Sequence, residues 1–179
     1  MICRYGPANA PIKTVYQGIK ELLPHTEVIY KKGCDIIDPH FPESEILDFP
    51  KTAEEVQLME EAIRAAKQAE VVVMVLEGNE LTVREDRSRT SLNLPGRQEE
   101  LLKAVCATGK PIILVMLDGR ASSINYAAAH IPAILHAWFP GEFCGQAVAE
   151  ALFGDYNPGG RLAVTFPKSV GQIPFAFPF

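Results

Sequence analysis

The sequence predicts an α/β protein: a doubly wound, mostly parallel sheet with helices on both faces. Two observations predict this fold class. Segments with the apolar spacing of helices alternate along the chain with short apolar runs, which is typical of repeated strand–helix units. The runs VVVMVL at 71–76 and IILVML at 112–117 contain no polar residue, as is usual for strands whose two faces are both covered by helices.

Length and charge limit the function classes. The 179 residues fit one domain, which we expect to span 1–179, but are too few for a (β/α)8 barrel of about 250 residues. The net charge is −5 and no basic stripe is present, so nucleic-acid binding is not expected. No apolar stretch reaches the roughly 18–20 residues of a membrane span, so no membrane partner is expected. No signal peptide is visible in the sequence, which says little about compartment.

The first third of the chain combines one helix, one strand and a long loop. Residues 12–23 have helical spacing and end before Pro24. TEVIY at 26–30 is predicted to be a strand. The segment 31–51 holds three prolines and several acids and is predicted to be irregular. Because the pattern begins with a helix, the sequence leaves open whether the domain's own first strand is absent.

The remainder alternates more regularly. The clearest helix follows Thr52, which has the spacing of a capping box with Glu55. Further strands are predicted at 71–76, 112–117, 133–138 and, as an edge strand, 162–166. Further helices are predicted at 98–108, 122–129 and 142–153, and a Gly- and Pro-rich turn at 154–160.

Metal and cofactor sites have no sequence signal. The cysteines show neither CxxC spacing nor a cluster with histidine, which favours reduced structural thiols; they are Cys3, Cys34, Cys106 and Cys144. The G-x-G-x-x-G, P-loop and G-x-S-x-G patterns are also absent from the sequence. We therefore expect no metal and no cofactor.

Charged residues concentrate in the loop after the predicted strand at 71–76. Seven of the thirteen residues at 77–89 are charged, and both signs are mixed. In open α/β sheets, ligands bind beyond the carboxyl ends of the strands. Two interpretations follow: the loop presents a carboxylic acid to a polar ligand, or it is a salt-bridged surface loop.

Three stretches carry a resemblance to a known family. They read EDRSRTSLNLPGRQ from residue 85, GKPIILVMLDGR from residue 109, and AILHAWFPGEFCGQAVAEALFGDYNPGGRLAVTFPKSVGQIP from residue 133. Together they resemble the second, C-terminal α/β sandwich domain of family 3 glycoside hydrolases, the β-glucosidase and β-xylosidase group. The resemblance covers nearly the whole chain. It implies an α/β sandwich with flavodoxin-like layering and a chemistry without cofactor.

The resemblance also implies a reaction and a missing partner. A retaining exo-glycosidase needs two carboxyl groups about 5–5.5 Å apart. In the family, the nucleophile belongs to an N-terminal barrel and the acid/base glutamate to a loop of the second domain. This chain would then be a fragment without that (β/α)8 barrel, inactive alone, from an enzyme that hydrolyses terminal β-glucosides or β-xylosides. The alternative is a non-catalytic module that binds carbohydrate or packs on the barrel. Sugar specificity, oligomeric state and compartment stay open, although family members are often periplasmic or secreted.

Glu85 is the acid/base that the resemblance implies. The family often reads E-G-x-D-R before its L-x-L-P-G stretch, and Glu85 and Arg89 occupy the two ends of that pattern. Asp86 stands in place of the glycine and Ser88 in place of the aspartate. Some relatives of the bacterial β-glucosidase type also carry Ser before the Arg. Without the barrel, Glu85 is expected to be exposed.

Other residues of the loop keep alternative roles. Since the position of the acid/base varies across the family, Glu77 and Glu80 stay candidates for it. Three residues are expected to bind substrate or to orient the loop: Arg87, Arg89 and Trp138. For Trp138, packing at a sheet end or against the barrel competes with stacking on a sugar ring.

Overall fold

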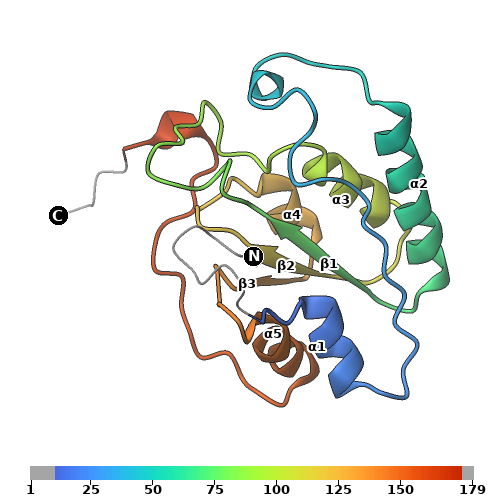
Figure 1. Ribbon diagram of the computed structural model, residues 1–179. Helices are drawn as coiled ribbons and strands as arrows, with labels where there is room; N and C mark the ends of the chain where they lie inside the picture. Colours follow the sequence, from blue (N-terminus) through green and yellow to red (C-terminus); the bar gives the residue numbers. More distant parts are fainter. Residues whose placement is uncertain (1–10, 175–179) are drawn as a thin grey trace.

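A sheet of three parallel strands lies at the centre of the computed structural model, which describes residues 11–174 (Figure 1). The strands β1 (Val72–Glu77), β2 (Ile112–Leu117) and β3 (Ala133–His136) follow one another in the order β1-β2-β3. Val72 pairs with Ile112, and Ile113 pairs with Ala133. The predicted parallel α/β class is therefore confirmed.

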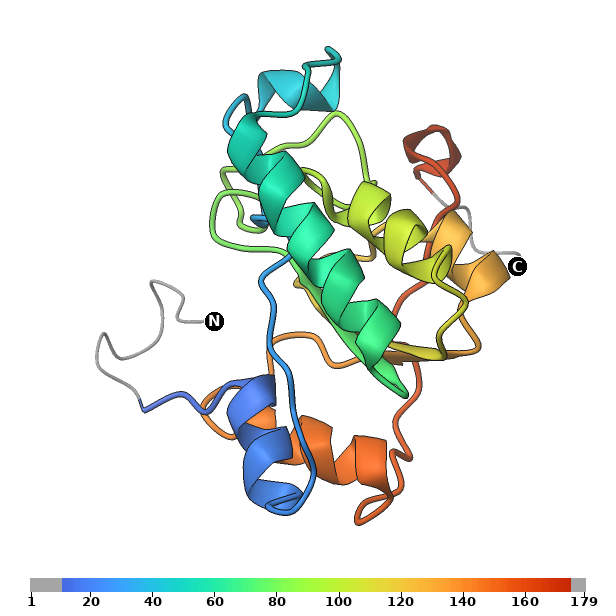
Figure 2. The same ribbon diagram turned by 90° about the vertical axis from the view of Figure 1, so that its right-hand side faces the viewer.

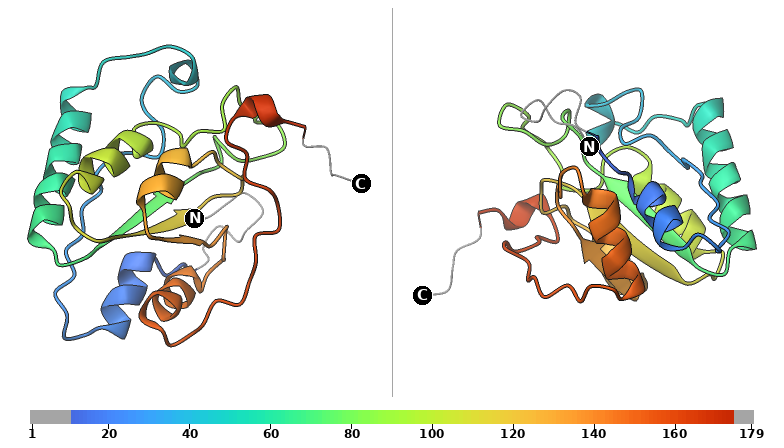
Figure 3. Two further views of the ribbon diagram at one scale, coloured as in Figure 1. Left: turned by 180° about the vertical axis from the view of Figure 1, so that it is seen from behind. Right: turned by 60° about the horizontal axis from the view of Figure 1, so that its bottom comes forward.

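Helices cover both faces of this sheet, as expected (Figures 1 and 3). On one face lie α2 (Ala53–Gln68), α3 (Gln98–Cys106) and α4 (Asn125–His130); on the other lie α1 (Val15–Leu22) and α5 (Cys144–Phe153). Figure 2 shows α2 and α3 side by side on their face. Two 3-10 helices, η1 (Glu43–Glu45) and η2 (Val170–Gln172), interrupt the long loops. In the described part of the chain, no helix has the length and apolarity needed to cross a membrane.

The most buried strand, β2, divides its side chains between two cores. Ile112, Leu114 and Met116 enter the cluster under α2, α3 and α4. Val115 and Leu117 enter the cluster formed with α1 and α5. Successive side chains of a strand point to opposite faces, so a continuous apolar run is what two covered faces require.

The helices α1 and α5 pack with their backbones in close contact. A Cβ placed on Gly18 would lie 1.9 Å from the carbonyl oxygen of Gly145, and one on Gly145 would lie 2.1 Å from the carbonyl oxygen of Thr14. The amide of Gly145 donates to the carbonyl of Lys13 at 2.9 Å. Only glycine leaves room for this approach.

Most predicted helices share at least one boundary residue with the helices of the structure. Thr52 is the N-cap of α2 and forms the predicted capping box with Glu55. Burial alone would raise the pKa of Glu55, but hydrogen bonds from Thr52 and Arg97 outweigh burial and lower it. The α4 helix begins at Asn125, later than predicted, and α5 ends at Gly154 in the left-handed conformation that stops a helix.

Two predicted strands are wrong. The segments 26–30 and 162–166 are not strands in the structure. The segment 162–166 has the alternation of a strand and 26–30 has a strand-like composition, but neither pairs with another strand among the described residues. Ile29 and Tyr30 are accordingly 45% and 61% exposed, and Leu162 and Val164 are also exposed. Alternation indicates a strand only where another strand is available to pair with it.

Candidate functional site

The carboxyl ends of the three strands meet at one edge of the sheet, where their loops pack together. A Cβ on Gly78, just after β1, would lie 2.4 Å from a carboxylate oxygen of Asp118 and 2.9 Å from Val83. The loop after β1 therefore folds tightly onto the turn after β2. This is the edge at which the sequence predicted a binding site.

Asp118 holds the turn after β2. It is 2% exposed. One carboxylate oxygen accepts from the Ser122 hydroxyl at 2.5 Å, and the other accepts from the Arg120 amide at 3.2 Å. A carboxylate bound in this way fixes a turn, as an Asx motif does.

Glu85 lies in a four-residue turn. The amide of Arg87 donates to the carbonyl of Arg84 at 3.2 Å, so that Glu85 and Asp86 are the two central residues. The side chains of Arg84 and Asp86 form an ion pair beside it. Glu85 is exposed, as predicted.

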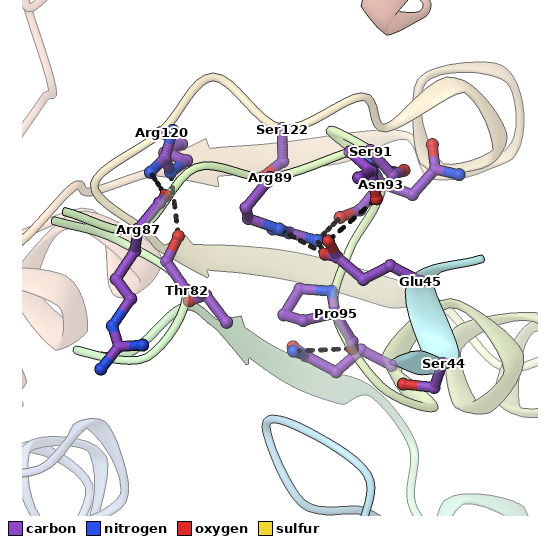
Figure 4. A network of polar contacts seen from close by, with 12 residues as sticks. Ser44, Glu45, Thr82, Arg87, Arg89, Ser91, Asn93, Pro95, Arg120 and Ser122 are labelled. Atoms are coloured by element: carbon purple, nitrogen blue, oxygen red, sulfur yellow. Dashed lines mark hydrogen bonds and ion pairs between the residues drawn. The ribbon is translucent and has the colours of Figure 1, made fainter. Parts of the chain in front are cut away.

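One guanidinium holds this turn from the side of β2 (Figure 4). Arg120 donates from Nε to the carbonyl of Thr82 at 2.9 Å, and from Nη2 to the carbonyls of Arg84 at 3.4 Å and Arg87 at 2.5 Å. Arg87 takes part through its backbone, and its side chain points away from the network.

A buried ion pair holds the other end of the loop. Arg89 pairs with Glu45 of η1, and the two side chains are only 4% and 8% exposed (Figure 4). Arg89 also donates to the carbonyl of Asn93 at 3.0 Å. Asn93 in turn forms an isolated parallel bridge with Ser123. Of the two roles expected for Arg89, this geometry fits orientation of the loop.

The alternative glutamates lie at the beginning of the same loop. Glu77 ends β1, and its backbone amide and carbonyl are both bonded by the Gln98 side chain at 2.8 Å. Its own side chain is partly buried, and burial raises its pKa. Glu80 is also partly buried. All three candidate carboxylates thus come from one loop, and they differ in exposure.

Trp138 lies in an aromatic cluster after β3. Its backbone φ of 56° cannot continue a strand, which explains why β3 ends at His136 rather than at 138 as predicted. The ring centroids of Trp138 and His136 are 4.2 Å apart, and Phe166 lies 5.0 Å from His136. Burial lowers the pKa of His136. Trp138 packs at the sheet end, which is one of its two expected roles.

Two cavities lie beside the long loop at 31–51. The larger, of about 350 Å³, is lined by Asp35, Asp38 and Arg97 among others, and by none of the predicted site residues. The smaller, of about 160 Å³, includes Arg89 and Glu45 in its wall. Across residues 11–174, no three His, Cys, Asp or Glu side chains form a group that could hold a metal ion.

Sequence reasoning missed the residues that hold the loop. Arg120 had a usable signal, because it follows an Asp-Gly pair directly after the buried strand β2. Glu45 had none, since it lies 44 residues before its partner Arg89 in an irregular segment. Gln98 was predicted only as the first residue of a helix.

Comparison with known proteins identifies the family of this chain. Residues 4–179 match the family described as the glycosyl hydrolase family 3 C-terminal domain. A β-xylosidase of Formosa agariphila is 42% identical, and the match covers 92% of this chain and 21% of the relative. A periplasmic β-glucosidase of Salmonella typhimurium is 39% identical, covering 94% and 23%.

Solved structures give the same result. A β-glucosidase from Erythrobacter marinus superposes with a TM-score of 0.82 at 35% identity, over 96% of this chain and 25% of that one. A β-glucosidase from Listeria innocua in complex with isofagomine gives 0.74 at 27% identity, over 92% and 20%. The chain thus spans about a fifth to a quarter of the length of these relatives, and it belongs to the glycosyl hydrolase family 3 C-terminal domain family.

Proposed function

We propose that this chain is the α/β sandwich domain of a retaining β-glycosidase that removes terminal β-linked glucose or xylose, and that Glu85 is its acid/base. The relatives named β-xylosidase and β-glucosidase support the reaction. The observation that carries the role of Glu85 is its place in an exposed turn, fixed at the edge where the strand ends meet.

The chemistry requires a second carboxylate from outside this chain. In a retaining reaction, the nucleophile attacks the sugar while the acid/base donates its proton to the leaving oxygen. The acid/base then accepts a proton from the water that releases the sugar. A barrel domain in the same protein supplies the nucleophile and most of the sugar contacts in this proposal, and the 179 residues alone hydrolyse nothing.

The exposure of Glu85 suits this division of labour. A carboxyl that acts on a sugar bound by another domain has to reach out of its own domain. Glu85 is the exposed member of the three candidate glutamates, whereas Glu77 and Glu80 are partly buried. The resemblance of the loop to the family pattern supports the same residue.

The test is Glu85→Gln in the full-length protein, assayed on aryl β-glucosides and β-xylosides with and without azide. Loss of an acid/base lowers the rate by about 10²–10⁴-fold, and azide, which needs no base to attack the glycosyl-enzyme, restores part of it. Glu77→Gln and Glu80→Gln are the matched controls. If only Glu77→Gln or only Glu80→Gln lost activity that azide restored, that residue would be the acid/base instead of Glu85. Unchanged turnover in all three variants would support the non-catalytic module.

A further inference from the structure

We infer that Arg120 is a positioning residue for acid–base catalysis, because its guanidinium fixes the turn that presents Glu85. The inference rests on the role proposed for Glu85. Arg120 acts through the backbone on either side of Glu85, because its guanidinium donates to main-chain carbonyls.

Arg120 supports the turn from outside it. Arg84 and Arg87 are the first and last residues of the turn, and Arg120 Nη2 donates to the carbonyls of both. Arg120 Nε donates to Thr82, two residues before the turn. Three carbonyls near Glu85 are therefore bound by one planar group. Figure 4 shows two of these contacts, those from Arg120 to Thr82 and to Arg87.

The chemistry of the guanidinium suits this task. It has five N–H donors in a rigid plane and no acceptor, so it can bind several carbonyls at once. Bonds from an ionised donor are roughly twice as strong as neutral ones. A lysine ammonium is a single point on a flexible stem and cannot hold three carbonyls in the same arrangement.

Arg120 is itself held by the core. Its amide donates to Asp118, whose carboxylate is buried and also bound by Ser122. Asp118 directly follows β2, the strand that enters both apolar clusters. A continuous chain of contacts thus runs from the centre of the domain to the turn, which makes the position of Glu85 a property of the folded core.

A positioning role and a merely stabilising role predict different kinetics. A general acid is needed when the leaving group is a poor one, such as methanol, and much less when it is dinitrophenol, which leaves without a proton. Misplacing Glu85 should therefore lower kcat/KM selectively on the methyl glycoside. Loss of folded protein would lower kcat/KM equally on both substrates.

The experiment compares Arg120→Lys and Arg120→Ala in the full-length protein, with Arg64→Ala on the exposed face of α2 as the control for loss of a positive charge. We expect R120K to lose up to about 100-fold in kcat/KM on the methyl glycoside and to keep nearly all of it on the dinitrophenyl glycoside. R120A should behave likewise if it folds, and R64A should match the parent protein on both substrates.

A double variant separates this inference from the one it rests on. Once Glu85→Gln has removed the acid, adding Arg120→Lys should cause no further loss on the methyl glycoside, because the two residues act as one unit. An additive loss, or an equal loss on both substrates, overturns the role of Arg120 while leaving Glu85 intact. If E85Q itself shows no dependence on the leaving group, the proposed function fails first.

Discussion

The ion pair between Arg89 and Glu45 allows a quantitative test of what holds the loop. In Arg89→Met, the long apolar stem is retained while the charge and its hydrogen bonds are lost. Glu45 then stays at a buried position without its cation, because only 8% of its side chain is exposed. The carbonyl of Asn93 also loses its donor.

The expected cost follows from burial. An exposed ion pair contributes about 0–1 kcal/mol, whereas removing one partner of a buried pair costs about 3–5 kcal/mol. With side chains only 4% and 8% exposed, this pair belongs to the second class. For a chain of this length, each kcal/mol shifts Tm by about 2–4 °C, so R89M should lower Tm by about 6–20 °C.

Thermal unfolding followed by circular dichroism measures this shift, and hydrogen exchange of the amides at 85–93 reports the loop itself. The double variant Arg89→Met with Glu45→Leu is the control, since it removes both charges and should recover most of the lost stability. A loss below about 1 kcal/mol for R89M would place the pair among ordinary surface pairs and refute the reasoning.

Three other predictions concern packing and protonation. Gly18→Ala should lower the free energy of unfolding in urea by about 1–3 kcal/mol or more, because its Cβ would lie 1.9 Å from the Gly145 carbonyl oxygen. An unchanged urea midpoint would contradict the α1–α5 contact. Burial raises the pKa of Glu77, so the free energy of unfolding falls as pH rises through that pKa. Glu77→Gln should therefore stabilise the protein at neutral pH but not at about pH 4. A variant that is less stable than the parent at neutral pH would contradict this. Burial raises the pKa of Cys34 to about 12 and also raises that of Cys144. Iodoacetamide should therefore alkylate both thiols slowly until urea unfolds the protein. Rapid alkylation of the native protein, measured by mass spectrometry, would contradict this.

The fold was predictable where a segment's own pattern decides its structure. The strand at 112–117 agrees with β2 to the residue, because its burial on both faces leaves a continuous apolar run. Thr52 was found because a capping box is a local signal. The segments 26–30 and 162–166 failed because pairing depends on a neighbour that the segment itself does not encode. Of the four cysteines predicted to be reduced structural thiols, Cys3 lies outside the described residues.

The candidate site was predictable in its location and incomplete in its parts. The charge density at 77–89 marked the loop, and the rule for parallel sheets marked the edge. The exposure expected for Glu85 agrees with the structure. The residues that hold the loop were not predictable, because they are distant from it in the sequence. Arg120 lies 33 to 38 residues after the carbonyls that it binds, and Glu45 lies 44 residues before Arg89. Such distances in the sequence become contacts only after the sheet has formed.

These two supports suggest how the loop can present a carboxyl from a fixed backbone. Under the proposed function, Glu85 has to reach a sugar bound by another domain, so it has to lie at the surface of this one. A fixed backbone suits this requirement: Arg120 holds the turn, and Arg89 with Glu45 holds the segment that follows it. The two interpretations of the loop, a salt-bridged loop and an acid-presenting loop, are then compatible. The buried ion pair and the guanidinium contacts would fix the position of Glu85 closely enough for proton transfer.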